Sequence, residues 1–102
     1  GSPLIQAADA GYLEIVRLLV EAGADVDLVV PGDENPLIRA AGSGHLEVVR
    51  LLLDRGADPN IRTFEAPAPW RPEGEVRTPL LQARRGGHDE VARLLLARGA
   101  RE

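Results

Sequence analysis

The sequence predicts an all-α solenoid of three helix-turn-helix repeats, and three observations lead to this prediction. A Pro-Leu pair recurs at intervals of 33 and 43 residues, at Pro3, Pro36 and Pro79. The first two copies share 15 identities in 26 ungapped positions, and the second and third share 14 in 24. Aromatic residues make up only 3% of the chain against 44% hydrophobic residues, which favours small, similar core layers of Leu, Val, Ile and Ala. About ten residues are inserted before the third copy.

The sequence of each copy contains capping signals for both ends of its first helix. It begins after a residue whose side chain can cap the first turn: Ser2, Asn35 and Thr78. A proline follows each cap, at the first helical position, where its missing N–H costs nothing. The helix ends near a glycine that suits a left-handed conformation and a tight reversal: Gly11, Gly44 or Gly87.

The second helix of each copy follows directly, as in Leu13–Glu21. Its charged residues in the first copy are spaced three and four apart, which predicts one solvated face, at Glu14, Arg17 and Glu21. We expect the remaining, apolar positions to face inward. The helix ends at Gly23, Gly56 or Gly99. The stretches Asp25–Asp27 and Asp58–Asn60 then predict turns in which the side chains bond to nearby backbone amides rather than to calcium.

The strings Pro-Leu-Ile-x-Ala-Ala-x-x-Gly, Gly-His-Leu-Glu-Val-Val-Arg-Leu-Leu-Leu and Gly-Ala-Asp-Pro-Asn together resemble ankyrin repeats over nearly the whole chain. The resemblance implies an ankyrin-repeat solenoid of paired antiparallel helices stacked in an L-shape, with a hairpin-like loop projecting from each junction. It also implies a binding surface on the concave side, formed by loop tips and first helices. The family pattern has Thr-Pro-Leu-His, and the His position is occupied here by Ile5, Ile38 and Leu81. The hydrogen bonds of that His are therefore expected to be absent or replaced.

We expect a single domain over residues 1–102, with repeats at approximately 1–29, 30–62 and 74–102 and the inserted loop within 61–77. The third copy has Arg84 and Asp89 at positions that are Ala or Leu in the other two, which predicts a polar C-terminal cap. The first copy shows no reciprocal change. Either the chain is cut from a longer array, or it is a monomer that pairs weakly with a second copy through this uncapped repeat.

The insertion contains four residues that break helices, at Pro67, Pro69, Pro72 and Gly74, so an extended loop is predicted. It also contains two of the three aromatic residues, Phe64 and Trp70. One hypothesis is that the loop presents Trp70 and Arg71 to a partner, because Trp and Arg dominate binding hot spots. The alternative is that Phe64 or Trp70 folds back and covers apolar surface between the second and third copies.

Several kinds of chemistry are not expected. The chain has no Cys, which excludes disulfides and thiolate catalysis. Its net charge of −4 argues against binding to nucleic acid. His45 and His88 recur at equivalent repeat positions, which packed helices hold about 10 Å apart, too far for a shared metal. Ser43 has no plausible general base. We therefore expect no active site and no cofactor. No apolar run is long enough for a membrane span and no signal peptide opens the chain, so we also expect no membrane contact and a cytoplasmic location.

The charge is divided unevenly along the chain: residues 1–60 carry a net −6 and residues 61–102 a net +2. The C-terminal part therefore has candidates for contact with an acidic partner surface, at Arg62, Arg71, Arg77, Arg84 and Arg85. The alternative is an ordinary solvated face.

These observations lead to the hypothesis of a non-catalytic module that binds a protein partner through loop tips and the concave face. The candidate residues of the first junction are Val29, Val30, Asp33 and Glu34. Those of the second junction are Arg62, Phe64, Trp70 and Arg71. Those of the inner helices are Arg39, Ser43 and Arg85. The alternatives are a structural or regulatory segment of a larger enzyme or sensor, and an engineered repeat scaffold with no natural partner.

Overall fold

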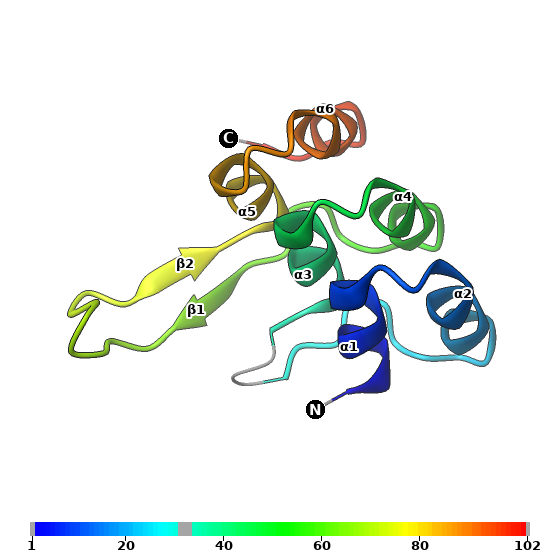
Figure 1. The fold of residues 1–102 in the computed structure, drawn as a ribbon, viewed down its shortest axis with the longest axis horizontal. Coiled ribbons are helices and arrows are strands. Elements are labelled where there is room, and N and C mark those ends of the chain that lie inside the picture. The colour runs from blue at the N-terminus through cyan, green and yellow to red at the C-terminus, as the bar shows by residue number, and fades with distance from the viewer. Residues whose placement is uncertain (1, 31–33, 102) are drawn as a thin grey trace.

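The computed structural model describes residues 2–30 and 34–101, and its helices form three antiparallel pairs. The pairs are α1 (Pro3–Ala10) with α2 (Leu13–Glu21), α3 (Pro36–Ser43) with α4 (Leu46–Asp54), and α5 (Pro79–Arg85) with α6 (Asp89–Ala97). Figure 1 shows α1, α3 and α5 stacked in an inner layer and α2, α4 and α6 in an outer one. The predicted solenoid of helix-turn-helix repeats is confirmed.

The predicted helix caps are confirmed, and the strongest of them is Asn35. Its Oδ1 accepts hydrogen bonds from the amides of Leu37 (2.9 Å) and Ile38 (3.1 Å). The Ser2 and Thr78 hydroxyls each accept one bond, at 3.4 and 3.1 Å. Because the caps fix where each inner helix begins, they also fix which of its side chains face the neighbouring repeats.

The core consists of aliphatic and Ala side chains from all six helices, as the composition predicts. Ile5 and Ile38, at the family's His position, are fully buried, so apolar packing replaces that residue's hydrogen bonds. The equivalent Leu81 in the third copy is half-exposed. All three aromatic residues lie outside the core.

One expectation for α2 is wrong: not all its apolar positions face inward. Leu18 is 65% exposed, whereas Leu51, at the same position of the second copy, is 9% exposed. Ile15 is likewise exposed, and its equivalent Val48 is buried. In the second copy this side of the helix lies against the preceding repeat, and in the described chain no repeat lies beyond α2 (Figure 1).

The inserted segment forms a projecting β-hairpin, the largest departure from a purely helical chain. Strands β1 (Thr63–Glu65) and β2 (Glu75–Arg77) pair antiparallel, with Phe64 opposite Val76. Figure 1 shows the hairpin extending away from the inner helices. The expectation of an extended segment and a hairpin-like loop is confirmed. The preceding junction is shorter, and Val30 forms an isolated bridge with Glu34 there.

Candidate functional site

The hairpin is braced by ion pairs on one of its two faces. Arg71 reaches back from the tip to Glu75 (2.9 Å) and Glu65 (3.6 Å). The Nε of Arg77 lies 3.1 Å from the same Glu75 carboxylate. Alternate residues of a strand, and their cross-strand partners, share a face, which is why these charges gather on one side. Because they are partly buried, solvent screens them less than it screens isolated surface pairs.

The same charges tie the hairpin to the helical body. Arg77 pairs with Glu34 of the shorter junction, and Arg85 of α5 pairs with Glu75. Glu34 is only 5% exposed and adopts a left-handed backbone with φ of 73°. Such a conformation is uncommon for a residue other than glycine and indicates that the surrounding contacts fix it. The hairpin is thus anchored at its base and stiffened towards its tip.

At the tip, a tight turn holds Trp70 away from the body. The backbone amides of Ala68 and Arg71 each donate to the other residue's carbonyl, at 2.9 and 2.8 Å. Pro69 and Trp70 occupy the two central turn positions, the first of which proline favours. Trp70 is 82% exposed and Phe64 63% exposed, so the fold-back alternative is wrong for both aromatics.

A small polar hollow of about 180 Å³ lies beside the hairpin base, on the inner helices. Three predicted residues meet there, Glu34, Arg39 and Ser43, together with Arg77. The Ser43 hydroxyl donates to Asp9 of α1 at 2.8 Å, which links two repeats across the hollow. With a guanidinium, a hydroxyl and carboxylates in one place, the hollow can exchange hydrogen bonds with a polar group of a partner.

The other predicted residues are distributed over the surface. Val29 is exposed and Val30 is half-buried at the first junction, and Asp33 lies outside the described residues. Arg62 is exposed and lines a different hollow, on the far side of the hairpin base. Arg71 and Arg85 both take part in the ion pairs of the hairpin.

Sequence reasoning missed two features of this surface. Asp9 and Gln82 line the polar hollow, and they occupy the same repeat positions as Gly42 and Arg39. Comparing the solvent-facing positions of the inner helices from copy to copy would have found them. The histidines do more than follow a glycine: His45 Nε2 lies 2.9 Å from the Asp9 carbonyl. His88 makes the equivalent contact with Gly42 at 3.1 Å, so each histidine joins its repeat to the one before.

Family models decide the identity of these repeats. A model described as "Ankyrin repeats (3 copies)" matches residues 1–63, more than half of the chain. A second, "Ankyrin repeats (many copies)", matches residues 37–96. The chain belongs to the ankyrin repeat family.

A solved ankyrin repeat structure agrees with this assignment. The crystal structure of the human ASB11 ankyrin repeat domain superposes with a TM-score of 0.82 at 32% sequence identity. The match covers 99% of this chain and 41% of that one, so the chain spans less than half the length of that ankyrin domain. Among curated proteins, none matches this sequence.

Ankyrin repeats are generally protein–protein interaction modules and are typically non-catalytic. Across residues 2–30 and 34–101, no group of three or more His, Cys, Asp or Glu is placed to hold a metal ion. No helix in this described part is both long enough and apolar enough to cross a membrane. The hairpin tip exposes Trp70, and the polar hollow brings Glu34, Arg39 and Ser43 together.

Proposed function

We propose that this ankyrin chain is a non-catalytic module of the cytoplasm that binds a protein partner through its hairpin and inner-helix face. The observation that carries the proposal is Trp70, a large aromatic side chain that is 82% exposed on a braced hairpin. An exposed Trp of this kind has no role in the core. Tryptophan is among the residues most enriched at the energetic centres of interfaces.

The binding mechanism in this proposal is rigid surface complementarity. The ion pairs of Arg71 and Arg77 hold the hairpin before any partner arrives, so little conformational entropy is lost on association. Trp70 and Phe64 supply apolar area at the hairpin. Arg39 and Ser43 supply hydrogen bonds at the polar hollow, with Val29 extending the surface towards the first junction.

Affinity capture from the source cell tests the proposal. The bait is compared with two variants, Trp70→Ala and a chain in which a Gly-Ser turn replaces residues 66–73. A genuine partner should be captured by the intact protein and by Arg93→Ala, an exposed control on α6, and lost from both hairpin variants. Partners retained by all four proteins would rule out binding through the hairpin. Circular dichroism shows that each bait is folded.

A second candidate function, a structural or regulatory segment of a larger enzyme or sensor, is supported by the apolar face of α2 that carries Leu18 and Ile15. Leu18 and Ile15 are exposed there, although their equivalents in the second copy are buried in a repeat–repeat contact. In this proposal the face stacks on another repeat or on a second copy of the chain. Sedimentation equilibrium of the intact chain and of Leu18→Ser tests the self-pairing. A monomer at all concentrations refutes it, and concentration-dependent association that Leu18→Ser abolishes supports it.

A further inference from the structure

The five arginines proposed as contacts for an acidic partner lie at two different places in the structure. Arg71, Arg77 and Arg85 are engaged in the ion pairs of the hairpin. Arg62 and Arg84 both line a second hollow, of about 430 Å³, between the hairpin base and α5. This volume is within the range of ligand-binding pockets. With Arg101, three arginines of the C-terminal part therefore lie at one site to which the proposed function assigns no role.

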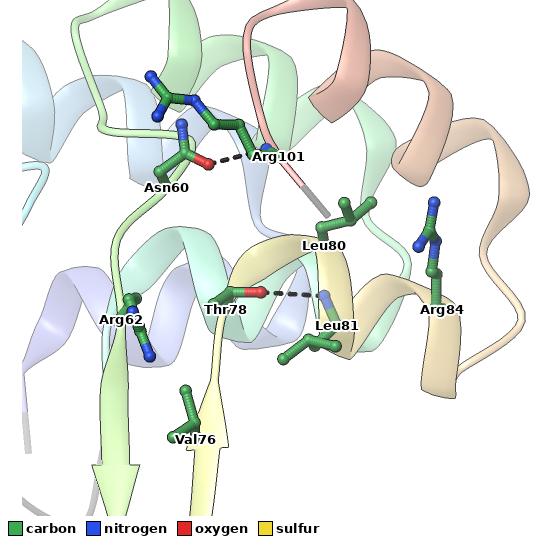
Figure 2. Close-up of a pocket in the computed structure, with 8 residues that line it drawn as sticks. All are labelled: Asn60, Arg62, Val76, Thr78, Leu80, Leu81, Arg84 and Arg101. Carbon is green, nitrogen blue, oxygen red and sulfur yellow. Dashed lines mark hydrogen bonds between the residues drawn. The ribbon is translucent and has the colours of Figure 1, made fainter.

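The chemistry of this hollow is an apolar floor with a cationic edge. Val76, Leu80 and Leu81 contribute the apolar surface. Figure 2 shows Arg62 on one side of them and Arg84 on the other, with Arg101 above. Among the described residues that line the hollow, none is acidic. Within residues 2–30 and 34–101, neither Arg62 nor Arg101 makes an ion pair, so no described carboxylate offsets the charge of these two guanidiniums.

The apolar floor continues onto the hairpin. Phe64 lies opposite Val76 in the strand register, so both side chains are on the face that turns towards the hollow. Three of the flanking strand residues, Glu65, Glu75 and Arg77, are on the opposite face and form the ion pairs. The hairpin therefore has one face that carries ion pairs and one apolar face that leads to the arginines of the hollow.

We propose that this hollow and the adjoining hairpin face bind an acidic peptide segment of a partner that carries an aliphatic side chain between its carboxylates. The aliphatic group would pack on Val76 and Leu81, and the carboxylates would pair with Arg62 and Arg101. Charge complementarity selects this occupant, because the described edge of the hollow carries three arginines and the floor carries three apolar side chains, which match carboxylates and an aliphatic group. The proposal names a partner chemistry and a surface that are separate from the Trp70 tip.

Fluorescence anisotropy with defined peptides tests this site. The probe is a fluorescein-labelled peptide, Glu-Asp-Leu-Leu-Asp-Glu, at low salt. Two control peptides replace the leucines by Ser or the acids by their amides. We expect the probe to bind with a Kd below about 100 μM and both controls to bind at least about fivefold more weakly. Equal binding of the Ser peptide, or of a deoxythymidine oligonucleotide of the same charge, would overturn the proposal in favour of a nonspecific anion site.

Variants locate the binding on the protein. Arg62→Glu should raise the Kd of the probe by about tenfold, because it removes a cationic contact. Leu81→Ser should raise it by at least about threefold, because it removes apolar surface from the floor. Arg93→Glu, the same charge change on the exposed face of α6, should alter it by less than about twofold. Equal weakening by Arg62→Glu and Arg93→Glu contradicts the proposal, as does the absence of binding to the intact protein. Trp70→Ala should leave binding of the peptide unchanged. The test of the acidic-peptide site can therefore fail without the Trp70 proposal failing, and the reverse.

Discussion

The most informative stability prediction concerns Asn35, a polar side chain that is fully buried between the first and second repeats. Its Oδ1 caps α3 by accepting from the Leu37 and Ile38 amides, and its Nδ2 donates to the Leu28 carbonyl at 3.2 Å. One side chain thus begins an inner helix and holds the junction that precedes it. Asn35→Ala removes both functions at once.

The magnitude follows from these contacts. Loss of an N-cap costs about 1 kcal/mol. The Leu28 carbonyl loses its donor, and because Leu28 is only half-buried, we take the lower end of the usual penalty, about 1 kcal/mol. We therefore expect Asn35→Ala to lower the free energy of unfolding by about 2 kcal/mol, or to lower the Tm by about 8–16 °C for a domain of this size. Asn35→Ser, which keeps a cap acceptor but lacks the reach to Leu28, should lose about half as much.

Urea unfolding followed by circular dichroism measures these differences, with a constant slope as the check that only stability has changed. Ser2→Ala is the matched control, because that cap makes a single bond of 3.4 Å. It should cost no more than about 0.5 kcal/mol. The reasoning is refuted if Asn35→Ala and Ser2→Ala destabilise equally, or if Asn35→Ser is as damaging as Asn35→Ala.

Three further predictions concern the glycines, the ion pairs and the single Trp. A Cβ at Gly44 would lie 2.6 Å from the His88 ring, whereas one at Gly56 would meet nothing within 4 Å, and both have a positive φ. Urea unfolding should therefore show Gly56→Ala costing about 1–2 kcal/mol and Gly44→Ala at least about 1 kcal/mol more. Arg77→Ala leaves the buried Glu34 carboxylate without its partner and should destabilise the hairpin by about 1–3 kcal/mol. Amide hydrogen exchange in β1 and β2 should then be faster, and unchanged exchange would contradict the claim that these ion pairs hold the hairpin. Trp70 emission should already be that of a hydrated indole in the folded protein and should change little on unfolding in urea, whereas a large red shift would mean that the side chain packs.

The repeat architecture could be predicted from the sequence because each signal was local and occurred three times. The caps at Ser2, Asn35 and Thr78 and the glycine stops fix helix boundaries without reference to the rest of the chain. The inward direction of α2's apolar positions could not be predicted in the same way. Burial of Leu18 depends on whether a neighbouring repeat lies beside it, and one helix's periodicity does not contain that information.

The candidate site was predictable in part. Glu34, Arg39 and Ser43 were identified singly, and the structure brings them together at one hollow. The ion pairs of Arg71 and Arg77 depend on strand register in a loop that Pro and Gly interrupt, and the turn at the tip sets that register. The exposed state of Trp70 was one of two open alternatives, because composition alone does not show whether a lone aromatic in a loop packs or projects.

The central claim is that Trp70 contacts a partner and does not support the fold. The direct test is the Kd of a captured partner for the intact protein, for Trp70→Ala and for the control Arg93→Ala, beside the unfolding free energy of each. The account predicts that Trp70→Ala weakens binding by about 30-fold, equivalent to about 2 kcal/mol, and changes stability by less than about 0.5 kcal/mol. Unchanged affinity, or a loss of stability as large as the loss of affinity, would contradict it.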